Sequence, residues 1–298
     1  MIRIGTEHVT CSLFKDHPPA ARVPSGQTVI FETMDCYGNQ IRSEDLDFTG
    51  SKRDFSNPAT GPLFVEGAEP GDILKVEILD IQVADQGVMY VRPGTGALGD
   101  VFRSARIKII PVENGEAVFN DKLRLQLQPM IGVIGTAPLT EIPTTTPHAH
   151  GGNMDCKRIV KGSTLYLLVF VAGALLSMGD LHGVMADGEI VICGVEMAGE
   201  VTVRVEVIKN RSLPLPLVVE GDQFMALASA DTLDQAASDV THAMHSFLTK
   251  EVGIDVHEAG MLLSLIGELR ICQIVDPLLT TRMEVPLSLL KAYGYLLP

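Results

Sequence analysis

The segment EVTVRVEVIK, from Glu200 to Lys209, alternates apolar and polar residues without a break. Side chains on a β-strand point to opposite faces in turn, so four valines share one face, opposite Thr202, Arg204 and Glu206. Such a strand belongs to a sheet that is buried on one side and wet on the other. This pattern constrains the fold most, because a helix would scatter the valines around its surface.

Other segments in the first two thirds of the chain carry strand signals. They are rich in β-branched residues, and one runs into Asn114-Gly115, a dipeptide typical of tight hairpin turns. These segments are Thr28 to Asp35, Asp72 to Val83, Arg106 to Val112 and Lys122 to Gln128. Prolines and glycines are spread over many short turns. The expected fold class is therefore mainly β, a sandwich or a barrel.

The last quarter of the chain has helical spacing. From Asp231, DTLDQAASDVTHAMHSFLTKEVG places apolar residues on one helix face, with an aspartate cap before it and Gly253 after it. We expect a second helix over HEAGMLLSLIG, a strand over Leu269 to Asp276 and a short last helix entered through Pro286. The C-terminal portion is therefore predicted to be α+β.

The change of pattern suggests a division of the chain. The segment at about 212–223, SLPLPLVVEGDQ, is rich in proline and is the expected linker. It would separate a β-rich domain at 1–211, which holds the candidate metal site, from an α+β portion at 224–298 that packs on it.

Composition excludes several classes of function. The chain has 298 residues, of which 46% are hydrophobic, and a formal net charge of −14. It can bury a large core, but it lacks the basic stripe that a nucleic-acid partner needs. The apolar run from Leu165 to Met178 is too short for a membrane span and is expected to form a buried strand pair, so we expect no membrane partner.

Cysteine usage bears on the compartment. The five cysteines are odd in number, widely spaced and without a CxxC motif, and the first residues lack the apolar core of a signal peptide. A cytoplasmic protein is therefore expected.

Candidate metal ligands cluster around Gly151-Gly152. His148, His150, Asn153 and Asp155 can converge there, because glycine permits the positive φ that turns a backbone back on itself. The alternative is a surface turn stabilised by the polar side chains, with two solvated histidines. This segment alone does not decide between them.

A second segment, GDLHGVMADGE, follows the apolar run directly. Asp180 and His182 stand two residues apart, which on an extended segment places them on one face, and Asp187 and Glu189 repeat the spacing. Imidazole with carboxylates suits zinc, manganese or iron(II), whereas carboxylates alone suit calcium or magnesium. The alternative is an acidic hairpin with a structural histidine. Because each of the two segments supplies half of a usual ligand set, together they favour a metal site.

Two further residues are candidates for the site. Asp35 ends an apolar strand and could add a carboxylate from a third segment, although on its own it is a turn residue. Cys156 could act as a thiol nucleophile of the kind that nitrilase-like amidases use. A cysteine is more often a small buried apolar residue, and no spacing marks a base beside it.

Long stretches of the chain resemble one enzyme family. HGGNMD, KGSTLYLLVFVAGALLSMGDLHGVMADGEI and CGVEMAGEVTVRVEVI are similar to the acetamidase/formamidase family of amide hydrolases, as are VPSGQTVIFETMDCYGNQI, GVIGTAP and LRICQIVDP. The resemblance implies hydrolysis of short aliphatic amides, on a β-rich fold, with a divalent metal in the active site and oligomeric assembly.

The resemblance also implies roles for the residues already singled out. Its metal positions fall on Asp35, His150, Asp155, Asp180 and His182. Its proton-transfer candidates fall on Glu189 and Asp187. The family commonly shows proline-glycine before the HGGN histidine, whereas this chain has Pro147-His148-Ala149. That departure leaves the substrate open, because a histidine can protrude where glycine leaves space.

The sequence therefore predicts an amidase. The metal, zinc by preference with calcium as a possible addition, would polarise the amide carbonyl and activate water. Glu189 or Asp187 would transfer the proton, and His148 and Asn153 would contact the substrate. The alternatives are a non-catalytic metal-binding or ligand-binding β-sandwich, and an amidase with Cys156 as nucleophile. Apolar C-terminal segments such as YGYLLP predict packing on the main domain or on a second subunit, in a homodimer or higher even oligomer.

Overall fold

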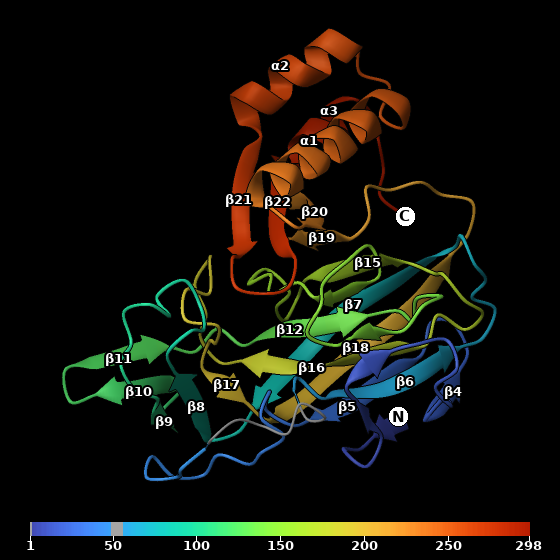
Figure 1. The fold of residues 1–298 in the computed structure, drawn as a ribbon. Helices are drawn as coiled ribbons and strands as arrows, with labels where there is room; N and C mark the ends of the chain where they lie inside the picture. Colours follow the sequence, from blue (N-terminus) through green and yellow to red (C-terminus); the bar gives the residue numbers. More distant parts are fainter. Residues whose placement is uncertain (1, 49–55) are drawn as a thin grey trace.

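The computed structural model describes residues 2–48 and 56–298 and is built around two large β-sheets (Figure 1). The first sheet has nine strands. In spatial order they are β1 (Ile2–Ile4), β5 (Thr28–Thr33), β18 (Gly199–Ile208), β7 (Ile73–Val83), β15 (Thr164–Leu168), β19 (Leu217–Glu220), β20 (Gln223–Ala230), β22 (Leu279–Pro286) and β21 (Glu268–Gln273).

The second sheet has eleven strands. Its main path runs through β11 (Leu123–Gln126), β10 (Glu116–Asn120), β9 (Arg106–Glu113), β8 (Gln86–Val91), β17 (Glu196–Met197), β16 (Leu176–His182), β12 (Met130–Gly135) and β14 (Gly151–Asn153). Three further strands join this sheet. β6 (Ala59–Val65) pairs with β16, and β2 (Val9–Thr10) and β4 (Ala21–Val23) pair with β6. A separate two-stranded ribbon pairs β13 (Ile142–Pro143) with β3 (Ser12–Leu13).

The main core lies between the two sheets. Phe31 and Val201 of the first sheet pack in one cluster with Leu63 and Met178 of the second, and all four side chains are fully buried. Three valines of β18 are buried on this side, whereas Arg204 and Glu206 of the same strand are exposed. The alternating pattern therefore sets the inner face of the sheet, and the predicted mainly β fold class is confirmed.

Three helices cover the C-terminal end of the first sheet: α1 (Leu233–Lys250), α2 (Val256–Ile266) and α3 (Leu287–Ala292) (Figure 1). A second core forms where Val240 and Phe247 of α1 pack with Phe224 of β20 and Val285 of β22. These elements form the expected α+β portion. The N-cap of α1 differs from the prediction, because the side chain of Thr232, not of Asp231, accepts the capping hydrogen bond from the backbone N–H of Gln235.

The boundary between the two parts is continuous. The expected linker at about 212–223 contains β19, which pairs with β15 on one side and with β20 on the other. The first sheet therefore runs without interruption from the β-rich part into the α+β portion. The apolar run from Leu165 to Met178 supplies buried residues to β15 and β16, but these strands lie in different sheets and do not pair.

The C-terminal tail packs against its own chain. The ring of Tyr295 meets that of Phe247 edge to face at 5.2 Å, and Leu297 packs on the helical core. In the described part of the chain, no helix is long and apolar enough to cross a membrane.

Candidate metal centre

A cavity of about 810 Å³ gathers side chains from segments far apart in the sequence. Its lining comes from the ends of β8, β14, β16 and β17 and from the segments that follow β5 and β21. Four of the lining residues are acidic: Asp180, Glu189, Glu196 and Asp276. One histidine, His182, also lines the cavity. The cavity therefore combines imidazole and carboxylate groups.

His182 stands at the centre of these acids. It ends β16, and its Nε2 lies 3.1 Å from Oε1 of Glu196 and 3.5 Å from Oδ1 of Asp180, while its Nδ1 lies 3.9 Å from Oδ1 of Asp155. Burial favours the neutral imidazole, but the carboxylates of Glu196 and Asp180 outweigh it and raise the pKa of His182 well above its usual value. The side chain is 1% exposed, so its partners are these acids and not solvent.

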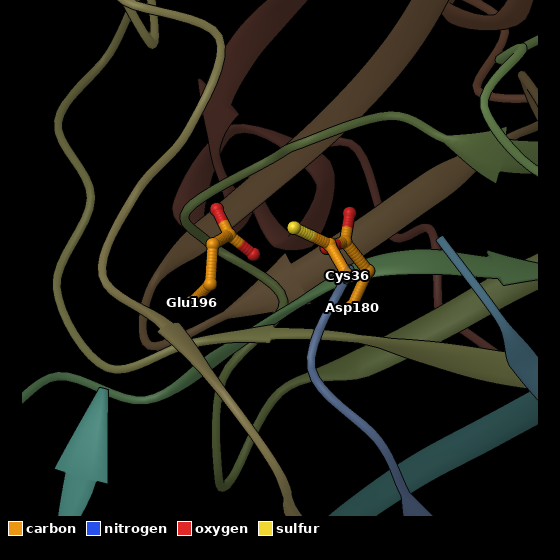
Figure 2. Close-up of side chains that lie close together, drawn as sticks. All are labelled: Cys36, Asp180 and Glu196. Atoms are coloured by element: carbon orange, nitrogen blue, oxygen red, sulfur yellow. The ribbon is translucent and has the colours of Figure 1, made fainter. Parts of the chain in front are cut away.

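Two groups of potential ligands meet around this histidine. In one, ligand atoms of Asp155, His182 and Glu189 all lie within 4.8 Å of one another. In the other, Cys36, Asp180 and Glu196 meet the same limit, and Figure 2 shows these three side chains pointing toward a common space. Cys36 comes from the segment after β5, Asp180 from β16 and Glu196 from β17.

The buried acidic residues raise one another's pKa values. Burial and the neighbouring Asp180 raise the pKa of Asp155 to about 6, and burial raises that of Glu196 to about 8. The pKa of Glu189 is raised well above its usual value by burial and then by Asp155. So many carboxylates in one dry space favour a bound proton or a bound cation.

Unpaired ligand atoms test whether a metal ion fits. Among the described residues, several buried carboxylate oxygens have no hydrogen-bond partner: Oδ1 and Oδ2 of Asp155, Oδ1 of Asp180, Oε2 of Glu189 and Oε2 of Glu196. Leaving buried charged groups unpaired is costly, and a divalent cation would satisfy them. The donor set of imidazole, carboxylates and a thiol therefore fits a metal ion, and the thiol suits zinc better than calcium.

The backbone is shaped to bring these ligands together. Asp155, Asp180 and Glu189 adopt φ values of 43°, 56° and 45°, in the left-handed region that non-glycine residues rarely occupy. Such strained residues concentrate at functional sites, where the surrounding structure holds them. Asp180 therefore departs from the regular extended backbone on which its convergence with His182 was expected, although the two side chains still meet.

Two glycines make room for the ligands. A Cβ on Gly132 of β12 would lie 2.5 Å from Oδ1 of Asp155 and 2.8 Å from Oδ2 of Asp180. A Cβ on Gly194 would lie 2.9 Å from Cγ of His182. Any larger residue at either position would push a ligand out of place.

Outer hydrogen bonds hold part of the site. The amide of Asn57 donates to Oδ2 of Asp180 at 2.8 Å, and the amide of Asn153 donates to Oδ2 of Asp276 at 2.9 Å. The backbone N–H of Gly194 donates to Oε1 of Glu196 at 2.8 Å. These contacts fix the side-chain directions, as outer partners do around metal ligands.

Five of the nine predicted site residues come together here: Asn153, Asp155, Asp180, His182 and Glu189. Asp187 does not join them. Its carboxylate forms a bidentate ion pair with Arg282, at 2.7 and 3.0 Å, and a further one with Lys157 at 3.1 Å. The guanidinium of Arg282 helps to hold the pKa of Asp187 below its usual value against the opposing effect of burial. A proton-transfer role needs an uncommitted carboxylate, which Asp187 is not.

Asp35 also lies outside both ligand groups. Its Oδ1 accepts hydrogen bonds from the backbone N–H groups of Tyr37 and Asn39, at 2.9 and 2.7 Å. The carboxylate therefore organises the loop that carries Cys36. Asp35 thus has the contacts of a turn residue, the alternative that its sequence position allows.

The two histidines of the Gly-Gly segment lie apart from the ligand groups as well. His148 is exposed and forms an isolated backbone bridge with Gly151. His150 is buried, and burial lowers its pKa to about 4. Neither residue lines the cavity, because the tight bend at Gly151 and Gly152 sends Asn153 and Asp155 toward the site instead.

Cys156 does not line the cavity either. Its thiol is fully buried and contacts that of Cys272, and this contact lowers the pKa of Cys156. Cys36, in contrast, lines the cavity, although burial raises its pKa well above the usual value. A thiol held in its neutral form is a poor nucleophile.

Three site residues were missed from the sequence: Cys36, Glu196 and Asp276. Glu196 lies between the buried Val195 and Met197, and an acid inside a buried apolar stretch was a signal that could have been used. Asp276 follows the strand that ends LRICQ, in the same position that drew attention to Asp35. Burial raises its pKa well above the usual value, with the nearby Asp155 adding to the effect.

The chain matches known structures over almost its whole length. It is 50% identical to an acetamidase from Bacillus halodurans, with a TM-score of 0.97, and the match covers 98% of this chain and 100% of that one. It is 41% identical to a protein from Thermoanaerobacter tengcongensis described as a predicted acetamidase/formamidase, with a TM-score of 0.97 and 99% of each chain covered.

Curated relatives give a more distant match. A formamidase from Methylophilus methylotrophus is 29% identical over 255 residues, which is 65% of this chain and 63% of the relative. The chain thus spans slightly less than two thirds of that protein's length. The model of the Acetamidase/Formamidase family matches residues 6–148 and 140–290 of this chain. With a buried acid and histidine cluster in its cavity and this match over most of its length, the chain belongs to the acetamidase/formamidase family.

Proposed function

We propose that this protein hydrolyses short aliphatic amides, such as formamide and acetamide, to a carboxylate and ammonia. The observation that supports it best is the set of unpaired carboxylate oxygens around His182, in a cavity large enough for a small amide. Family membership and the names of the relatives, an acetamidase and a formamidase, point to the same reaction.

We assign the metal ligands to the two groups around His182. Asp155 and His182 come from one group, whose third member, Glu189, is kept for proton transfer, and Cys36, Asp180 and Glu196 form the second group. Zinc is the preferred ion, because imidazole and thiolate are among its usual ligands. Calcium, which takes oxygen ligands, fits the second group less well because of its thiol. The chemistry that such a cation supplies is Lewis acidity and a lowered pKa of water.

Proton transfer is assigned to Glu189. Its Oε2 has no hydrogen-bond partner among the described residues, and it lines the cavity that the substrate would enter. A carboxyl group with a raised pKa can accept a proton from water at Oε2 and return it to the leaving nitrogen. We assign substrate contact to Asn153, whose amide donates to Asp276 and whose carbonyl oxygen, which accepts from Asn57 at 3.4 Å, can also accept from the substrate amide.

A direct assay tests the proposed reaction. Ammonia release is measured with formamide, acetamide and propionamide, for the purified protein and for the Cys156→Ser and Glu189→Gln variants. We expect turnover of at least one amide, unchanged by Cys156→Ser and lowered about 10²-fold or more by Glu189→Gln.

Two outcomes would favour the alternatives. Absence of ammonia release from all amides, in protein that contains metal, would support a non-catalytic metal-binding protein. Loss of turnover in Cys156→Ser with the fold intact would support thiol catalysis. The cytoplasmic location expected from the cysteines stays a prediction.

A further inference from the structure

Arg282 of β22 is a cation that the fold keeps out of water. The residue is 2% exposed. Its Nε donates to Oε1 of Glu284 at 2.6 Å, and its Nη1 donates to the carbonyl oxygen of Ile271 at 3.2 Å and to Sγ of Cys272 at 3.7 Å. These three partners lie on β21 and β22 themselves. Burying a charge is costly unless it is fully paired, so the remaining contacts of the guanidinium deserve an explanation.

The bidentate contact of Arg282 reaches outside the α+β portion. Its Nη1 and Nη2 donate to Oδ1 and Oδ2 of Asp187 at 2.7 and 3.0 Å. Asp187 lies on the segment between β16 and β17, and the half-buried Lys157 adds a contact to its Oδ2 at 3.1 Å. Two parallel bonds from a planar guanidinium fix both the place and the direction of a carboxylate, whereas an ammonium group acts as a point charge. Arg282 therefore fastens this segment to the α+β portion.

The backbone beside Asp187 is fastened to the same pair of strands. The N–H of Gly188 donates to the carbonyl oxygen of Cys272 at 2.8 Å, and the N–H of Ile274 donates to the carbonyl oxygen of Gly188 at 3.2 Å. Figure 1 shows the turn that joins β21 to β22 at the end of these strands away from the helices. Side-chain and backbone contacts thus hold two consecutive residues, Asp187 and Gly188.

Glu189 is the next residue, and its conformation needs such support. Its φ of 45° lies in the left-handed region, and its Oε2 has no hydrogen-bond partner among the described residues. Its backbone N–H donates to the carbonyl oxygen of Ala186 at 3.3 Å, within the same segment. Strained backbone persists only where the surrounding structure holds it. On the N-terminal side of Glu189, that hold comes from Asp187 and Gly188.

We propose that Arg282 is a positioning residue for amide hydrolysis, which clamps Asp187 and so holds the strained turn that directs Glu189 into the cavity. This role rests on the proposed function, because it takes Glu189 as the group that transfers the proton. Arg282 does not line the cavity, so it acts through Asp187 and not on the substrate.

Steady-state kinetics of Arg282→Lys test this role, with an amide that the wild-type protein hydrolyses. Lysine keeps the charge but gives up the bidentate contact, so kcat should fall about tenfold to a hundredfold, as small misplacements of catalytic groups cause. KM should stay within about twofold, because the cavity lining is untouched. Zinc content should stay at the wild-type level. An unchanged kcat, or a loss of zinc that accounts for the fall in kcat, would overturn the proposal.

Asp187→Asn breaks the same clamp from its other side. Asparagine keeps the shape of the side chain but leaves one acceptor oxygen, so kcat should fall with KM and zinc content unchanged. Asp187 is partly exposed, so this variant serves if Arg282→Lys folds poorly, and circular dichroism melts check both. Arg204→Lys is the matched control, because Arg204 pairs with Glu77 between β18 and β7, which supply none of the described cavity lining. Its kcat should equal that of the wild-type protein.

A double-variant cycle separates positioning from general structural damage. If Arg282 acts through Glu189, Arg282→Lys should leave the residual kcat of Glu189→Gln within about twofold. Structural damage would lower kcat by the same factor in both backgrounds, and that result would overturn the proposal.

The same measurements separate this role from the proposed function. Absence of amide turnover in the wild-type protein, or full turnover in Glu189→Gln, would remove the proton-transfer assignment and this role together. A fall in Glu189→Gln without a fall in Arg282→Lys or Asp187→Asn would remove this role alone.

Discussion

Among the residues of the site, His182 has the central position. It lies within 4 Å of three buried carboxyl groups, those of Asp155, Asp180 and Glu196. With a cation present, the neutral imidazole can serve as a ligand, and without one its protonated form offsets the surrounding negative charge. The carboxylates thus have two possible counter-charges, and metal binding must displace the proton.

Replacing His182 should therefore affect metal content before it affects the fold. In His182→Ala we expect metal content to fall, with amide turnover lowered at least tenfold, because loss of one ligand weakens binding and disorganises the site. Elemental analysis and the ammonia assay measure both. His257→Ala, at an exposed helix position, is the control. Wild-type metal stoichiometry with wild-type turnover in His182→Ala would remove this residue from the site.

Only part of this site could be predicted from the amino-acid sequence. Asp180 and His182 could be found because they are close in the chain and flanked by glycines. Glu196 and Asp276 could not be found in that way, because their roles depend on β17 pairing with β16 and on the end of β21 bridging to Gly188. Asp187 shows the reverse limit: its spacing matches that of Asp180, but a distant residue, Arg282, pairs with it.

At the scale of the element, β12 and β16 form the support on which the ligands stand. They pair antiparallel, with Val133 opposite Gly179 and Met130 opposite His182, and every residue of both strands is buried. Gly132 lies in this pair at the point where Asp155 and Asp180 approach. The strand alternation could be read from the sequence, but it reports only which face a side chain takes. It does not report the partner strand, which is why β15 and β16 were wrongly expected to pair.

Gly132→Ala tests this support. The added methyl group would collide with both carboxylates, so we expect metal affinity to fall about tenfold to a hundredfold while the protein still folds. Competition with a chromogenic chelator measures the affinity. Gly260→Ala is the matched control, because a Cβ at that helical position meets nothing within 4 Å. Equal metal affinity in the two variants would show that the close approach at Gly132 does not matter.

At the scale of the whole molecule, the charge cluster links folding to pH. The main sandwich core buries Glu196, with its pKa raised to about 8, and Asp155, with its pKa raised to about 6, so both hold protons in the folded state that the unfolded chain has lost. Stability from a raised pKa is lost as pH rises through that pKa. Burial lowers the pKa of His150 from 6.5 to about 4, so this residue makes stability rise with pH, but only below about pH 6.5.

Metal-free protein should therefore become less stable between about pH 6.5 and about pH 8. The free energy of unfolding should fall by about 1.4 kcal/mol per pH unit for each proton retained only in the folded state. Urea unfolding of chelator-treated protein across this range measures it. Metal-loaded protein, whose carboxylates are ionised by the cation, should show a smaller dependence. A metal-free stability that stays constant or rises with pH in this window would mean that the acids are not buried as described.

We propose that the cluster around His182 is the metal centre of an amidase. It is tested most directly by measuring amide turnover and bound metal in the same samples, during removal by a chelator and stepwise return of zinc. Turnover should fall with metal content and recover in proportion to the zinc that binds. Full turnover in protein verified to be free of metal would contradict the claim.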